Sequence, residues 1–141
     1  VPNVAGFGEL STVGLIAPGT DGPRGPGPDR VDWLYVAVTY ADKDVYRAIP
    51  PVSRRVLSSD GLLMSLSGTG FSSFTKFDTS YTTNSFPFNY VAGFSYDGFT
   101  YFISNQKEDF GSNVIVSKMN RVCQTSPFFD SYTEITLQCE G

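Results

Sequence analysis

The chain has 141 residues, which suits one domain. Ten lysines and arginines against 14 aspartates and glutamates give a formal net charge of −4, so we expect neither nucleic acid nor an anionic membrane surface as a partner. Histidine, the commonest general base and metal ligand, is absent. Two cysteines are too few for a cysteine-rich zinc site. We therefore predict no enzymatic activity, no catalytic residue, no metal and no cofactor.

The composition favours strands over helices. Aromatic residues make up 15% of the chain, and it contains 14 glycines and 9 prolines. Aromatic residues are enriched in strands, and glycine and proline form the turns between them. No apolar run approaches the roughly 18 residues of a membrane-spanning helix, so we expect no membrane insertion of this segment.

The first half of the chain predicts strands separated by turns. Residues 11–17 form a short apolar strand closed by Pro18-Gly19, and the proline- and glycine-rich residues 20–30 form an exposed loop. Residues 32–40 are apolar on both faces, which is typical of a buried central strand. Residues 45–56 continue as extended chain, and residues 62–66 begin at most a short helix before the next glycines.

The second half contains the clearest hairpin. Asp97-Gly98 separates two aromatic-rich runs, residues 90–96 and 99–104, and this dipeptide is typical of a two-residue type I′ turn. A polar tip at residues 105–113 leads to another strand at residues 114–123.

The last predicted strand covers residues 131–139 and alternates between two faces. One face carries polar residues and Tyr132, and the other carries Ile135, Leu137 and Cys139, so the second cysteine lies with the apolar residues. In total we expect seven or eight antiparallel strands. Such a chain protects its strand edges by forming a barrel, a sandwich or a propeller.

Several groups of residues could carry chemistry, and each also has a purely structural interpretation. Asp42-Lys43-Asp44 resembles the start of a calcium loop but lacks the later ligands, so a solvated turn is favoured. Glu108 and Asp109 are an acidic pair in the polar tip, without a second carboxylate that would make an acid–base pair. The aromatic residues between 71 and 102 could stack on sugars or bases, but strand-core packing is favoured.

Cys123 and Cys139 allow three interpretations from the residues alone. They could be bridged to each other, remain reduced, or form bridges to cysteines outside this chain. Their spacing does not choose among these.

Four stretches in this order resemble a sema domain, the seven-bladed β-propeller of semaphorins, plexins and the hepatocyte growth factor receptor group. They are residues 33–40 with Ser53-Arg54-Arg55, then residues 94–102 with Asp97-Gly98-Phe99-Thr100-Tyr101-Phe102, Arg121-Val122-Cys123, and Ser131-Tyr132-x-Glu134-x-x-Leu137-x-Cys139. The Ser-Tyr-x-Glu form is similar to the receptor side of the family, plexins first, rather than to semaphorins themselves. The resemblance covers roughly residues 11–141.

The resemblance implies a function and a location. Residues 1–141 are expected to be a partial sema domain of about two blades, an internal piece of an all-β propeller with open sheet edges. The implied work is extracellular protein–protein recognition of a semaphorin-type ligand, in the ectodomain of a single-pass, plexin-like cell-surface receptor. The rest of the propeller, or another chain, would complete the fold.

The resemblance also implies roles for particular residues. Charged loop tips are the expected ligand-binding residues, namely Asp42, Lys43, Asp44, Lys107, Glu108 and Asp109. Cys123 and Cys139 are each expected to form a disulfide with a partner outside these residues. In agreement, the length of the last strand should separate the two cysteines by roughly 25 Å, whereas a disulfide needs Cα atoms within about 7 Å.

Two other functions remain as alternatives. The first is a self-contained secreted β-sandwich or barrel that binds or hydrolyses carbohydrate, which would need closed sheet edges and an aromatic-lined cleft. The second is a structural module that only holds other domains in place.

Overall fold

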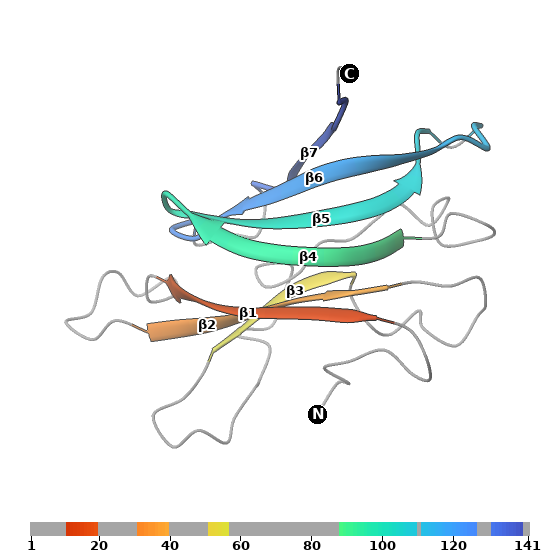
Figure 1. The fold of residues 1–141 in the computed structure, drawn as a ribbon. Coiled ribbons are helices and arrows are strands. Elements are labelled where there is room, and N and C mark those ends of the chain that lie inside the picture. The colour runs from red at the N-terminus through yellow and green to blue at the C-terminus, as the bar shows by residue number, and fades with distance from the viewer. Residues whose placement is uncertain are drawn as a thin grey trace.

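The computed structural model describes residues 11–19, 31–39, 51–56, 88–109, 111–126 and 131–139. These residues form seven strands in two antiparallel sheets, which lie one above the other as two layers (Figure 1). The strands are β1 (Thr12–Gly19), β2 (Val31–Val38), β3 (Val52–Val56), β4 (Phe88–Tyr96), β5 (Phe99–Lys107), β6 (Ile115–Cys123) and β7 (Thr133–Thr136). The described part of the chain contains no helix. The all-β, antiparallel prediction is therefore confirmed.

The first sheet has the order β1-β2-β3, with β2 at its centre. Trp33, Tyr35 and Ala37 are buried on the face toward the second sheet, and Val36 and Val38 are buried on the opposite face. The prediction of a central strand covered on both faces is thus confirmed. β3 extends the sheet through the residues that were expected to be extended chain.

The second sheet is a simple meander with the order β4-β5-β6-β7. Its first turn is the predicted one, because Asp97 and Gly98 have φ angles of 46° and 76° and Tyr96 pairs with Phe99. A type I′ turn needs positive φ at both central residues. β5 is longer than predicted, so Lys107 ends a strand instead of lying in the polar tip.

The main core lies between the two sheets. Phe88, Tyr90, Phe102 and Val122 of the second sheet pack there against the buried residues of β1, β2 and β3. The rings of Tyr90 and Phe102 meet edge-on, with centroids 6.0 Å apart. Aromatic rings that pack in this way bury large apolar areas and favour edge-to-face geometry.

A polar contact joins the two sheets at one end of the core. The Tyr90 backbone N–H donates to Thr39 Oγ1 at 3.1 Å, and Ser11 Oγ lies 3.0 Å from the Tyr90 carbonyl oxygen. The two hydroxyl oxygens of Ser11 and Thr39 are themselves 2.6 Å apart. The pairing of β4 with β5 shifts register between Tyr90 and Ala92. Buried backbone groups beside such an irregularity need hydrogen-bond partners outside the regular ladder, and Thr39 and Ser11 supply them to Tyr90.

β7 is shorter than predicted, and its polar side faces inward. Tyr132, just before β7, packs against the core, and Glu134 pairs with Lys118 of β6. Ile135 is 57% exposed, and Cys139 lies exposed beyond the end of the strand. The alternation was predicted correctly, but its apolar side belongs to the open face of the sheet.

Candidate protein-binding surfaces

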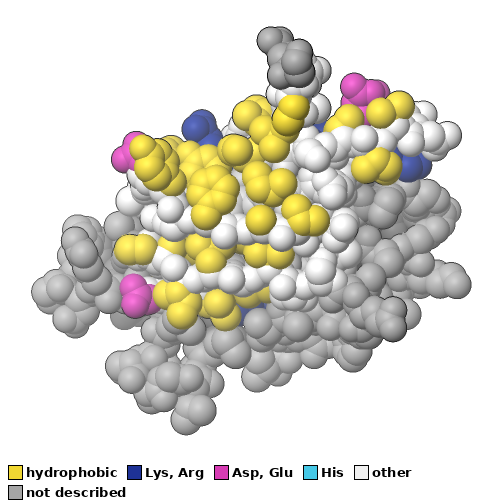
Figure 2. All heavy atoms as spheres, in the orientation of Figure 1, with side chains coloured by type: hydrophobic (Ala, Val, Ile, Leu, Met, Phe, Trp, Pro, Cys, Tyr) yellow, Lys and Arg dark blue, Asp and Glu magenta, His cyan; other side chains and the backbone are white. Residues whose placement is uncertain are grey.

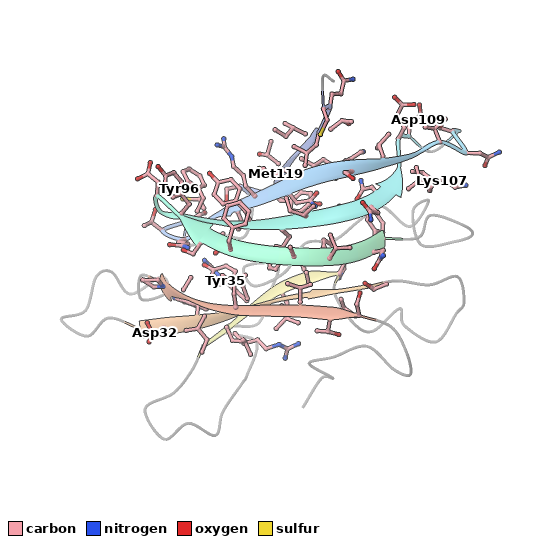
Figure 3. All side chains as sticks on the ribbon, viewed as in Figure 1. Asp32, Tyr35, Tyr96, Lys107, Asp109 and Met119 are labelled. Carbon is pink, nitrogen blue, oxygen red and sulfur yellow. The ribbon has the colours of Figure 1, made fainter. Side chains whose placement is uncertain are left out.

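The charged hairpin tip between β5 and β6 carries three of the predicted ligand-binding residues. Lys107 ends β5, and Glu108 and Asp109 follow it as exposed residues. Figure 3 shows Lys107 and Asp109 at one end of the second sheet, with Tyr96 at the opposite end. The other three predicted residues, Asp42, Lys43 and Asp44, lie outside the described residues, as do residues 20–30 and 62–66.

Local hydrogen bonds connect the described residues of this tip. The Gly111 backbone N–H donates to Asp109 Oδ1 at 2.9 Å, and the Glu108 N–H donates to the Val114 carbonyl oxygen at 3.0 Å. The Lys107 ammonium group donates to Asn113 Oδ1 at 3.5 Å. Because aspartate side chains commonly close turns in this way, Asp109 has a structural role beside its charge.

A second candidate surface is the outward face of the second sheet, on the side away from the first sheet. Figure 2 shows hydrophobic side chains gathered over β4, β5 and β6. Tyr96 is 70% exposed, Phe94 43%, Ile115 56% and Ile135 57%. We define the outward face by these four residues together with Phe99, Tyr101, Ile103, Met119 and Arg121. Contiguous exposed apolar surface of this kind marks an interaction site.

The side chains of the outward face stack on one another. The rings of Phe94 and Tyr101 are parallel, with centroids 4.9 Å apart and an interplanar angle of 9°. Arg121 lies over the ring of Phe99, with its guanidinium carbon 4.7 Å from the centroid. This geometry is a cation–π contact on an exposed surface.

Sequence reasoning missed this surface because it assigned the aromatic residues of the hairpin to the core. Phe88, Tyr90 and Phe102 do lie in the core, whereas Phe94 and Tyr101 lie on the opposite side. The sequence of β5 already indicated a second aromatic face. Successive side chains of a strand point to opposite faces, and aromatic residues occupy both alternating sets of positions in β5.

Beneath the outward face, a polar network fastens β7 to the rest of the sheet. The Tyr132 hydroxyl lies 2.9 Å from Asn120 Oδ1 and 3.3 Å from Glu134 Oε2. Glu134 also accepts from Lys118 at 2.9 Å and from Gln106 Nε2 at 3.3 Å. Burial, with the nearby hydroxyl of Tyr90 and the negative charge of Glu134, raises the pKa of Tyr132 above its ordinary value. The Tyr-x-Glu pattern therefore serves the packing of β7.

Both cysteines are free thiols in the structure. The Cys123 N–H bonds to Ser131 Oγ at 2.9 Å, and β6 and β7 are antiparallel, so Cys139 lies at the far end of the pairing. Burial alone would raise the pKa of the Cys123 thiol, but hydrogen bonds from Thr125 and Ser126 and the charge of Arg54 outweigh it and lower the pKa. External partners for both cysteines stay a prediction.

Two negative findings concern the described residues. Among them, no three acidic or cysteine side chains cluster in a way that could hold a metal ion. In the same part of the chain, no helix has the length and apolar character needed to cross a membrane.

No protein-family model matches the sequence, and no curated protein matches it either. Solved structures of the plexin A4 extracellular region do match. One covers domains 1 to 8 and the other domains 1 to 10 of that region; each has a TM-score of 0.64 and 26% sequence identity over 81% of this chain. The matched part is 14% of the first plexin chain and 11% of the second. This chain therefore has a plexin-like fold, consistent with part of a β-propeller, and it is similar to a module of a receptor ectodomain.

Proposed function

We propose that this chain belongs to the sema domain of a plexin-like cell-surface receptor, and that it recognises a semaphorin-type protein outside the cell. The observation that carries this proposal is the similarity of its two stacked sheets to the plexin A4 extracellular region. The order of the Arg-Val-Cys and Ser-Tyr-x-Glu stretches adds support, because β6 and β7 place them side by side.

In this proposal the charged hairpin tip contacts the ligand. Lys107, Glu108 and Asp109 stand at the end of a hairpin, and hydrogen bonds connect Lys107 with Asn113, Glu108 with Val114 and Asp109 with Gly111. Contacts of this kind reduce the conformational entropy that side chains lose on binding. Charged residues at the rim of an interface mainly steer association and set its salt dependence. The function involves no bond making or breaking, in keeping with a chain that lacks histidine.

The proposal includes an oxidising, extracellular setting. There each cysteine would form a disulfide with a partner outside these residues, as is usual for secreted domains. The partly exposed Cys123 and the exposed Cys139 are both accessible to such partners.

The test is a pull-down with a purified semaphorin sema domain as the probe. Retention of the folded chain supports recognition, and no retention favours a purely structural module. A carbohydrate array run in parallel tests the alternative, for which Tyr96 and Phe94 would supply the exposed aromatic surface. Saturable sugar binding without semaphorin binding would replace the proposal.

A further inference from the structure

An amine, a carboxylate and a carboxamide meet on the inward side of the second sheet. Gln106 lies on β5, Lys118 on β6 and Glu134 on β7 or its immediate register. The Glu134 carboxylate accepts from the Lys118 ammonium group at 2.9 Å through Oε1, and from Gln106 Nε2 at 3.3 Å through Oε2. One carboxylate therefore bonds to the nitrogen atoms of both an amine and an amide.

Two of these three side chains are almost completely buried. Gln106 is 1% exposed and the Lys118 side chain 10%, whereas the Glu134 side chain is 33% exposed. Lysine is almost never buried without a partner of opposite charge. An ammonium group that has lost its hydration depends on the carboxylate beside it. Transfer of one proton from Lys118 to Glu134 removes both charges and leaves an amine that can act as a nucleophile.

The strand register brings this amine close to the Gln106 carboxamide. Ser104 pairs with Lys118, and Gln106 pairs with Val116. Gln106 and Lys118 are thus diagonal neighbours on one side of the β5–β6 pair. Residues in this relation are about 7–8 Å apart in the backbone, which is within the reach of long side chains.

The Gln106 carbonyl group is held by a hydrogen-bond donor of its own. Ser104 Oγ donates to Gln106 Oε1 at 3.1 Å. The same hydroxyl oxygen accepts from Asn120 Nδ2 at 2.9 Å, so its single proton is directed to Gln106. Ser104 and Asn120 are both 0% exposed. A fixed donor at a carbonyl oxygen stabilises the negative charge that develops there when the carbonyl carbon is attacked.

We propose that Lys118 and Gln106 become joined by an intramolecular isopeptide bond, with Glu134 as the proton carrier. The Lys118 ammonium group gives a proton to Glu134, and the free Nζ attacks Gln106 Cδ. The new C–N bond forms while the carbonyl electron pair moves onto Oε1, beside the Ser104 hydroxyl. The bond from Cδ to Nε2 then breaks, and Nε2 leaves as ammonia with the proton that Glu134 carried.

The atoms and charges of this step balance without any co-reactant. Nζ loses a second proton as the amide forms, and that proton ends on the ammonia. The products are one secondary amide and one ammonium ion, and Glu134 returns to its carboxylate form. The bond forms once in each chain, between its own side chains, so it is distinct from turnover of a substrate. Positioning of the two groups within one fold supplies the main advantage over a reaction in solution.

Asn120 also carries a carboxamide near Lys118, but its contacts differ. Its Nδ2 donates to the Phe102 carbonyl oxygen at 3.4 Å and to Ser104, and its Oδ1 accepts from the Tyr132 hydroxyl at 2.9 Å. Asn120 therefore positions Ser104, whereas the Gln106 amide is the one that bonds to the carboxylate. A bond from Lys118 to Gln106 joins two strands and closes the β5–β6 hairpin at the base of its charged tip.

The test is the intact mass of the purified full chain with its cysteines reduced. We expect a mass that is lower than the sequence requires by one ammonia. Trypsin cleaves after lysine and arginine but not after an acylated lysine, so the digest should contain residues 77–107 joined to residues 108–121. An unaltered mass, with residues 77–107 and 108–118 as separate peptides, would overturn the proposal.

Two variants test the assigned roles. Lys118→Arg keeps the positive charge beside Glu134 but removes the amine, and Glu134→Gln keeps a side chain of the same shape but cannot carry the proton. Both should retain the full mass while circular dichroism shows the strand content of the original chain. Loss of ammonia from either variant would show that the roles are wrong. The mass of the unaltered chain decides the proposal even where a variant does not fold.

Lys107 and Asn113 provide a control within the same chain. The Lys107 ammonium group lies 3.5 Å from Asn113 Oδ1, but this contact is exposed, and in the described part of the chain no carboxylate bonds to both. We therefore expect no bond between them and complete cleavage after Lys107. Cross-linking at this pair as well would show that burial and the carboxylate are not required, and would overturn the proposed chemistry. None of these outcomes depends on semaphorin.

Discussion

Arg54 and Ser126 form a hydrogen bond of 2.7 Å that joins the two sheets of the chain. The guanidinium group donates to a backbone carbonyl and at the same time lies over the ring of Trp33. A buried charge needs such partners, because it loses its hydration on burial. The arrangement explains why an arginine occupies the core-facing side of β3.

Replacing Arg54 with methionine should therefore destabilise the chain. Hydrogen bonds to charged groups contribute about 1.5–3 kcal/mol, so we expect a loss of that size in urea unfolding. Arg121→Met is the matched control, because Arg121 also lies over an aromatic ring but its side chain is exposed. Its effect should stay within about 0.5 kcal/mol. Equal losses for the two variants would contradict this role of Arg54.

Gly93 allows β1 and β4 to approach each other. A Cβ at this position would lie 2.9 Å from Leu15 Cδ2 and 3.0 Å from both Phe102 Cδ1 and Val13 Cγ1. Gly93→Val should cost about 1–3 kcal/mol, the usual range for overpacking a core. At Gly14 the nearest atom would be 3.8 Å away, so Gly14→Ala should be neutral or should stabilise the strand by up to about 1 kcal/mol. Thermal unfolding of the two variants measures the difference.

The turn at Asp97-Gly98 makes a separate prediction. Gly98 has a φ of 76°, and nothing lies within 4 Å of a Cβ placed there, so any cost of substitution comes from backbone strain alone. Gly98→Val should lose about 1 kcal/mol or more. Gly98→Asn should lose less, because asparagine tolerates this conformation. If valine and asparagine have the same effect in chemical denaturation, the turn assignment is wrong.

Local patterns predicted this turn and the central strand β2 well, because each depends on nearby residues. Asp97 and Gly98 both adopt the positive φ angles that their type of turn requires. β2 carries apolar residues on both faces, which is typical of a central strand. The inward side of β7 could not be predicted in this way. Glu134 lies on the inward side because Lys118 and Gln106, which are on other strands, donate hydrogen bonds to its carboxylate there. Which side of β7 faces inward therefore depends on the register of β5, β6 and β7.

The outward face was only partly visible in the hairpin sequence. The alternation along β5 places aromatic residues on both of its faces, but an aromatic residue in a strand is usually a core residue. Tyr90 and Phe94 are four positions apart and would share one face of a regular strand. They lie on opposite faces because the pairing of β4 with β5 shifts register between Tyr90 and Ala92.

Alkaline pH should weaken the fold through Tyr132. Its pKa in the folded chain is raised above the ordinary value of about 10, so its contribution is complete below that pH. As the pH rises past about 10, the unfolded chain loses the phenolic proton while the folded chain keeps it, and stability falls. Tyr132→Phe should lose stability near neutral pH through its hydrogen bonds, but its stability should fall less steeply with alkaline pH. Urea unfolding at several pH values measures this dependence. If the free energy of unfolding falls equally steeply with pH in both proteins, the raised pKa of Tyr132 is contradicted.

Recognition of a semaphorin-type protein by this chain can be measured directly by surface plasmon resonance with a semaphorin sema domain. We expect saturable binding. Reversing the charges of Asp42, Lys43, Asp44, Lys107, Glu108 and Asp109 should lower the association rate and change its salt dependence, since charges at a rim steer encounter. An unchanged rate would remove these six residues from the interface. Absence of saturable binding to the folded chain would contradict recognition of a semaphorin-type protein.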